Sequence, residues 1–203
     1  MIGSLDFEDV SVRGRIAYGI MCAENYLIAK YPKKNWIMVF EIFWKVTLVE
    51  RLEFVDDWVD EVCDILPECL FEFPNYEMSD FEILTKDKYN DFKMLYSGVG
   101  EDVNTILKFV FDLANSHAYS RVIGKGKESL SVLQKIIDFM YEYNVSLPDV
   151  KEVKKFSIAE NDGFGYPFDV MSKKELNEKL QHSYEQSLRK EGRPLDEVFD
   201  EIE

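Results

Sequence analysis

The chain has 203 residues, 46% of them hydrophobic, with 15 Phe and 11 Tyr, which is enough apolar side chain for one sizeable buried core. The net charge of −15 disfavours nucleic acid and anionic membranes as partners, because binding to phosphates needs clustered Lys and Arg. The acidic N-terminus is unlike a secretory signal, and no segment reaches the roughly 18 uncharged apolar residues of a membrane span, so we expect a soluble cytoplasmic protein.

The first predicted helix follows Ser11, a residue suited to N-capping, and ends near Pro32. Its apolar positions recur at helical spacing: Val12, Ile16, Ile20, Ala23 and Leu27. Glycine lowers helix propensity by about 1 kcal/mol relative to alanine, yet Gly14 and Gly19 both lie inside this pattern. With Ala17 and Ala23 they would let neighbouring backbones come close. We therefore expect this helix to be central and largely buried.

A second helix is predicted over residues 36–50, with Asn35 as its cap and an aromatic-rich core face. A third follows within VDDWVDEVCDILPECLFEF, residues 55–73, and should end or kink at Pro67. One stripe of this helix is apolar: Val55, Trp58, Val59, Val62 and Leu66. Another face is expected to be acidic: Asp57, Glu61, Asp64 and Glu68.

Three further helices are expected near residues 85–96, 101–117 and 127–144. Residues 150–169 look irregular, with at most one short strand before an Asn-Asp-Gly turn. A capping box of Ser172 and Glu175 then opens a charged C-terminal helix and tail, residues 171–203, packed on the body or projecting from it. The predicted class is mainly α, with residues 1–170 as a single-domain multi-helix bundle.

Charge is concentrated in one segment. Residues 52–85 contain eleven Asp and Glu and no Lys or Arg, and so account for −11 of the net charge of −15. A solvated helix face is the usual explanation of such a run, but mixed charges would avoid the mutual repulsion. A binding face for a basic protein is an equally open interpretation. Paired carboxylates acting as a catalytic or divalent-ion site are a weaker one.

Other chemistry finds little support in the sequence. The three cysteines, Cys22, Cys63 and Cys69, and the two histidines lack zinc-ligand spacing, and buried thiols in a reducing compartment explain the cysteines better. His117 is adjacent to Ser116 on a helix, so the two cannot form a relay. RVIGKGKESL departs from P-loop spacing, although its helix start could bind an anion. LPDVKEVKK places its two carboxylates too close together for a restriction-type nuclease. We predict no catalytic residue, metal site or cofactor.

Several segments in order, SVRGRIAYGIMCAENYLIAKYP, VFEIFWKVT, ILPECLFEF, HAYSRVIGKGKESL and LPDV, resemble an all-α immunity family of bacterial polymorphic toxin systems, the immunity protein six type. The resemblance covers residues 10–169, and residues 172–203 extend beyond it. It implies a cytoplasmic, non-enzymatic protein that binds and neutralises the toxin encoded beside it. It carries over no set of functional residues.

The two arguments together predict a stoichiometric toxin inhibitor whose partner is basic, such as a nuclease with a basic cleft. On charge alone, the contact residues are expected to be Asp56, Asp57, Asp60, Glu61, Asp64, Glu68 and Glu72. Two alternatives stay open: a helical adaptor or scaffold that binds a basic peptide or protein, and a metal-dependent hydrolase that uses the clustered carboxylates. The oligomeric state does not follow from the sequence.

Overall fold

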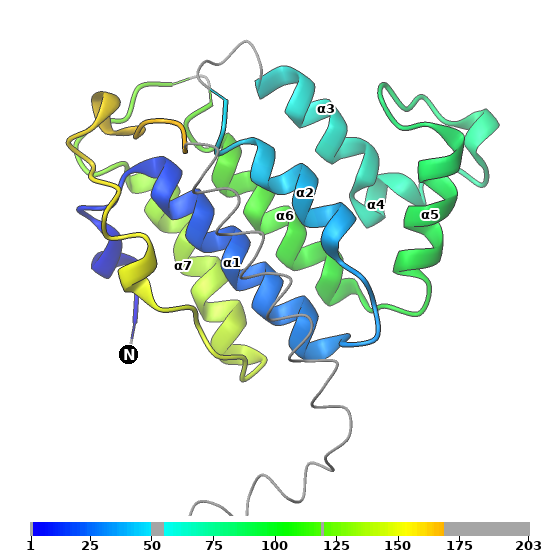
Figure 1. Cartoon of the computed structure of the whole chain (residues 1–203), viewed down its shortest axis with the longest axis horizontal. Helices are drawn as coiled ribbons and strands as arrows, with labels where there is room; N and C mark the ends of the chain where they lie inside the picture. Colours follow the sequence, from blue (N-terminus) through cyan, green and yellow to red (C-terminus); the bar gives the residue numbers. More distant parts are fainter. Residues whose placement is uncertain (1, 50–54, 119, 169–203) are drawn as a thin grey trace, which may run out of the picture.

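The computed structural model describes residues 2–49, 55–118 and 120–168 (Figure 1). These ranges form seven α-helices and no strand, which confirms the mainly α prediction: α1 Val12–Lys30, α2 Ile37–Lys45, α3 Val55–Ile65, α4 Pro67–Leu70, α5 Lys86–Tyr96, α6 Glu101–Asn115 and α7 Lys127–Glu142. Short 3-10 turns accompany them: η1 Ser4–Phe7, η3 Tyr76–Met78, η4 Val150–Glu152 and η5 Asn161–Gly163. The predicted C-terminal helix lies outside the described residues.

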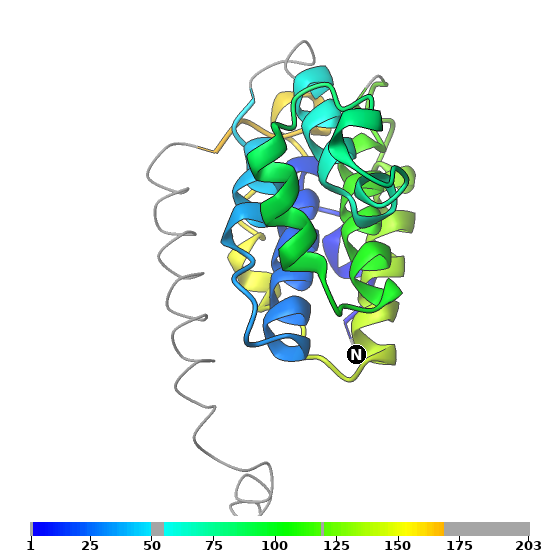
Figure 2. The ribbon, with the colours of Figure 1, turned by 90° about the vertical axis from the view of Figure 1, so that its right-hand side faces the viewer.

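Three helices, α1, α6 and α7, pack against one another and form the centre of the molecule. Helix α2 packs on α1 and leads to α3, which continues into α4. Helix α5 lies at the far end of the longest axis from η1, and Figure 2 shows α2 and α7 on opposite sides of the molecule. Within the described ranges, no helix is both long and apolar enough to cross a membrane.

Helix α1 is the buried central element that its small residues predicted. Ser11 Oγ accepts a hydrogen bond from the Gly14 amide at 3.2 Å and so caps the helix. A Cβ added at Gly19 would lie 2.8 Å from Leu113 Cδ2 of α6 and 3.0 Å from Ile136 Cδ1 of α7. Close approach of three helices at this point therefore explains why a residue of poor helix propensity occupies the position.

The same helix buries two arginines, which the sequence reading did not identify. Arg13 is 2% exposed and Arg15 is fully buried. Arg13 donates to the carbonyls of Val46, Thr47 and Val49, at 3.2, 2.7 and 2.9 Å. The first turn of α1 is thereby tied to the chain that follows α2.

Arg15 points to the other flank of α1. Its guanidinium donates to Phe7 O at 3.1 Å, Glu8 O at 3.2 Å, Gly126 O at 3.1 Å and Ser129 Oγ at 2.8 Å. Burial lowers the pKa of each arginine to about 10, because a desolvated guanidinium is less favourable than a hydrated one. Neutral oxygens accept hydrogen bonds from both cations, Arg13 Nε is left without an acceptor, and in the described ranges neither arginine forms an ion pair.

Two predicted details differ from the structure. Helix α2 ends at Lys45 instead of near residue 50, and the chain then turns so that its carbonyls meet Arg13. Residues 150–168 contain an isolated antiparallel bridge between Val10 and Ser157 instead of a strand. The Asn-Asp-Gly turn is present, and Asn161 and Asp162 adopt positive φ angles of 44° and 52°.

Replacing Arg15 with Met should lower the free energy of unfolding by about 3 kcal/mol, because several buried acceptors lose a charged donor. Urea unfolding followed by circular dichroism measures the change. Arg121→Met is the control, since Arg121 is exposed and has no ion pair among the described residues. Equal destabilisation by the two substitutions would contradict the assigned role of Arg15.

Glu24 provides a second test, because this α1 side chain is 5% exposed and accepts a hydrogen bond from Trp44 Nε1 at 2.5 Å. Burial raises its pKa from 4.5 to about 8, so the native state favours the protonated form. The stability that this proton provides is complete below pH 4.5 and is lost as the pH rises through about 8.

Glu24→Gln should therefore flatten the pH dependence of stability. At pH 8 the variant should be more stable than the parent by about 4 kcal/mol, and near pH 4 the two should be equal. Denaturant unfolding at several pH values measures this difference. Parallel pH profiles for the two proteins would show that Glu24 does not titrate in this way.

Candidate functional site

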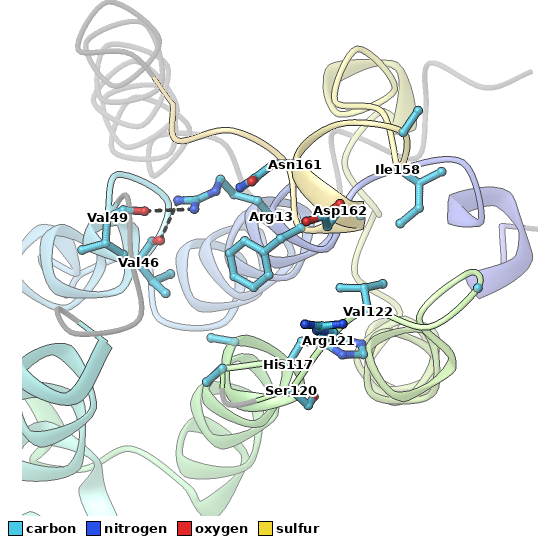
Figure 3. Close-up of a pocket in the computed structure, with 16 residues that line it drawn as sticks. Arg13, Val46, Val49, His117, Ser120, Arg121, Val122, Ile158, Asn161 and Asp162 are labelled. Carbon is cyan, nitrogen blue, oxygen red and sulfur yellow. Dashed lines mark hydrogen bonds between the residues drawn. The ribbon is translucent and has the colours of Figure 1, made fainter.

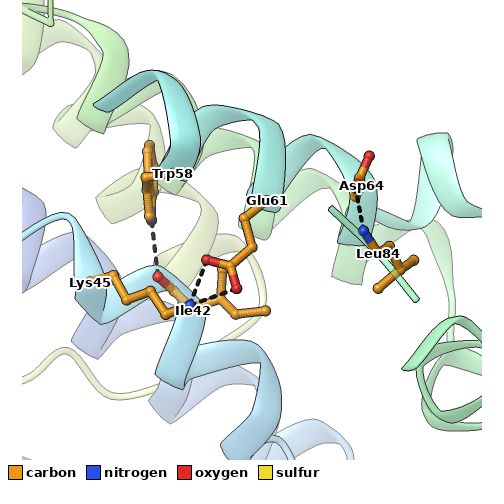
Figure 4. A network of polar contacts seen from close by, with 6 residues as sticks. All are labelled: Ile42, Lys45, Trp58, Glu61, Asp64 and Leu84. Carbon is orange, nitrogen blue, oxygen red and sulfur yellow. Dashed lines mark hydrogen bonds and ion pairs between the residues drawn. The ribbon is translucent and has the colours of Figure 1, made fainter. Parts of the chain in front are cut away.

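The acidic segment forms α3, α4 and the connection from α4 to α5. Trp58 and Val62 are buried, and Trp58 Nε1 donates to the Ile42 carbonyl at 2.9 Å, which holds α3 against α2 (Figure 4). The Trp58 ring also lies 5.8 Å from the Phe111 ring of α6. The predicted apolar stripe is thus confirmed at these positions, and its opposite side contains the carboxylates.

The predicted contact residues do not share one environment. Asp56, Asp57 and Asp60 of α3 are exposed, as is Glu72 after α4. Two others face lysines of neighbouring helices at 2.6 Å: Glu61 with Lys45 of α2, and Glu68 with Lys108 of α6. The ion pair with Lys108, joined by a hydrogen bond from Asn104, lowers the pKa of Glu68.

Asp64 is not on the exposed face, and its predicted placement there is wrong. Its side chain is buried, at 7% exposure, and its carboxylate accepts three backbone hydrogen bonds. The donors are the amides of Glu82 at 3.3 Å, Ile83 at 2.8 Å and Leu84 at 2.9 Å, and Figure 4 shows the bond from Leu84. Asp64 therefore holds the end of the α4–α5 connection against α3, and its carboxylate already has partners within the chain.

The α4–α5 connection adds exposed apolar side chains that the charge argument missed. Phe71 is 47% exposed, Met78 63% and Ile83 46%. They alternate along the chain with exposed acids: Glu72, Glu77, Asp80 and Glu82. We call the exposed acids of α3, together with these apolar and acidic side chains of residues 71–83, the acidic surface. Its residues belong to α3, which runs along one edge of the molecule, and to the α4–α5 connection at the end where α5 lies (Figure 1).

No nucleophilic or metal chemistry emerges from the described ranges. They contain no group of three or more His, Cys, Asp or Glu able to hold a metal ion. Cys63 and Cys69 are half-buried free thiols, and burial raises the pKa of both, to about 11 for Cys69, which disfavours a reactive thiolate. His117 is buried, and its ring nitrogens have no hydrogen-bond partner.

Comparisons of the chain with protein-family models, curated proteins and solved structures find no match.

The different roles of neighbouring acids can be separated by neutralising them one at a time. Asp64→Asn should lower the free energy of unfolding by about 2 kcal/mol, because an amide cannot accept all three charge-assisted bonds. Asp57→Asn, at an exposed position of the same helix, should change it by less than about 0.5 kcal/mol. Hydrogen exchange at the amides of Ile83 and Leu84 should accelerate in the first variant alone. Unchanged exchange there would argue against the anchor.

Proposed function

We propose that this chain is a cytoplasmic immunity protein that binds a cognate polymorphic toxin and neutralises it by stoichiometric association. Two observations support the proposal: the ordered segments that resemble the immunity family, and the acidic surface with apolar side chains among its carboxylates. The assignment of the contact surface depends on the second observation, the acidic surface. It brings together the apolar contacts and the charge complementarity by which a basic protein is recognised.

The proposed contact combines two functions within one surface. Asp57 and Asp60 are exposed on α3 and would attract a basic partner over a distance. Phe71 and Met78 would then lose water on contact, and aromatic and methionine side chains are enriched in interface cores. Lysines already neutralise Glu61 and Glu68, so these acids are expected to contribute less than their position in the sequence suggested.

A basic nuclease is the favoured class of toxin, because its cleft must attract phosphate and would equally attract carboxylates. An inhibitor that occupies such a cleft needs no chemistry of its own. The described residues accordingly supply a surface for binding, and we assign them no catalytic role.

Co-purification with the product of the adjacent gene is the direct experiment. We expect a 1:1 complex by calorimetry and loss of the toxin's activity in that complex. An adjacent product that neither binds nor loses activity would overturn the proposal. Binding without inhibition would instead favour an adaptor for a basic protein.

Charge reversal should map the contact surface. The double variant Asp57→Lys, Asp60→Lys is expected to slow association at least about tenfold at low salt, with a smaller effect at 0.5 M salt. Stopped-flow kinetics measures both rate constants. The control is the double variant Asp138→Lys, Glu142→Lys on α7, which reverses two exposed acids outside the acidic surface. Equal effects of the α3 and α7 reversals would show that only net charge matters.

Phe71→Ala tests the apolar half of the surface. It should leave the association rate unchanged and raise the dissociation rate about tenfold or more, since desolvated aromatic anchors act mainly on dissociation. Surface plasmon resonance against the toxin measures the two rates separately. Parent-like dissociation would remove Phe71 from the contact.

A further inference from the structure

A cavity of about 950 Å³ lies beside the first turn of α1, and none of its lining residues belongs to the acidic surface (Figure 3). Its walls come from the start of α1, the turn after α2, the end of α6 and two loops, residues 120–124 and 158–164. A volume of this size suits a small organic molecule, and a lone inorganic ion would leave most of it unfilled.

One wall of the cavity is cationic. Arg13 lines it with a guanidinium whose hydrogen bonds all go to neutral carbonyls, and whose Nε has no acceptor (Figure 3). Arg121 lines it with an exposed guanidinium that has no ion pair among the described residues. Two arginines that form no ion pair within the described ranges thus line one cavity, in a chain of net charge −15.

The buried arginine makes an anion favourable in this cavity. A guanidinium removed from water and surrounded by neutral oxygens is costly, and the lowered pKa of Arg13 reflects that cost. Its guanidinium borders the cavity, so a charge placed there would interact with it partly through protein and therefore more strongly than in bulk solvent. An anion placed there would compensate a charge that has no counter-ion among the described residues.

Other groups limit what the anion can be. Asp162 is the sole carboxylate among the described lining residues, and the left-handed turn at residues 161–163 carries it. His117 also lines the cavity, with unpartnered nitrogens and with Nε2 3.7 Å from Glu128 Oε2. The remaining wall is largely apolar: Val46, Val49, Val122, Ile158 and Phe164. A ligand with one anionic group and an apolar body would match the cationic and apolar parts of the wall.

We propose that the cavity binds a small organic anion, with a carboxylate, sulfonate or phosphate group held by Arg121 in the field of Arg13 and an apolar body against Val122, Ile158 and Phe164. This ligand site is separate from the acidic surface, so it stands or falls independently of toxin binding.

Two matched fluorescent probes test the proposal. 8-Anilinonaphthalene-1-sulfonate carries one sulfonate, and N-phenyl-1-naphthylamine has the same aromatic skeleton without that charge. Titration of the full chain should show one site for the sulfonate, with an affinity at least about fivefold higher than for the neutral probe. Equal affinities, or no binding of the sulfonate, would overturn the proposal.

Two variants that change the charge of the cavity in opposite directions test where the sulfonate binds. Arg121→Gln should weaken sulfonate binding about fivefold, whereas Asp162→Asn should strengthen it about twofold, and neither should alter binding of the neutral probe. Lys88→Gln, an equal charge change at an exposed position of α5, is the control and should have no effect. Identical responses of Arg121→Gln and Lys88→Gln would show that the probe senses net charge alone.

A variant that fills the cavity tests whether the probes bind there or on the apolar side chains of the acidic surface. Ala159 lines the cavity at an exposed position, so Ala159→Phe can occupy its space without disturbing the core. The variant should lose both probes while its unfolding midpoint stays at the parent value. Retained sulfonate binding in this variant would place the probe elsewhere and refute the assignment.

Discussion

The architecture depends on the two buried arginines at the start of α1. Their guanidinium groups reach opposite flanks of one helix turn, Arg13 toward the chain after α2 and Arg15 toward η1 and the start of α7. Each fork satisfies several carbonyls that loops would otherwise leave unpaired in the interior. Segments distant in the sequence are therefore positioned by donors on one helix, and one of these donors, Arg13, also lines the cavity.

Periodicity predicted most of the helical architecture, because each stripe of apolar residues can be buried only against other elements. The cap at Ser11 acts as its residue type suggests. The buried arginines were beyond such reasoning, since Arg15 meets Ser129, 114 residues away, and no local pattern signals that contact. The exposure of Asp57 was predicted for the same reason as the stripes, because this residue faces away from the apolar side of α3.

Counting charges along residues 52–85 overestimates the uncompensated negative charge of this segment. Residues 52–85 contain no base, yet lysines from three other helices reach it, with Lys45, Lys86 and Lys108 facing Glu61, Glu77 and Glu68. Part of the repulsion that seemed to demand a partner is thus relieved within the fold. Asp64 differs again, because its carboxylate is used by backbone amides. The remaining exposed acids, with Phe71 and Met78 beside them in the chain, define a smaller surface than the composition implied.

The anchoring of residues 82–84 by Asp64 has a consequence for the entropy of association. A loop that becomes ordered only on contact loses conformational freedom at that moment, which weakens binding. Here the backbone at Ile83 is already fixed by a carboxylate of the neighbouring helix. A protein that docks on the Ile83 side chain would meet a preformed surface. Little of the free energy gained by covering Ile83 would then be lost in ordering the chain.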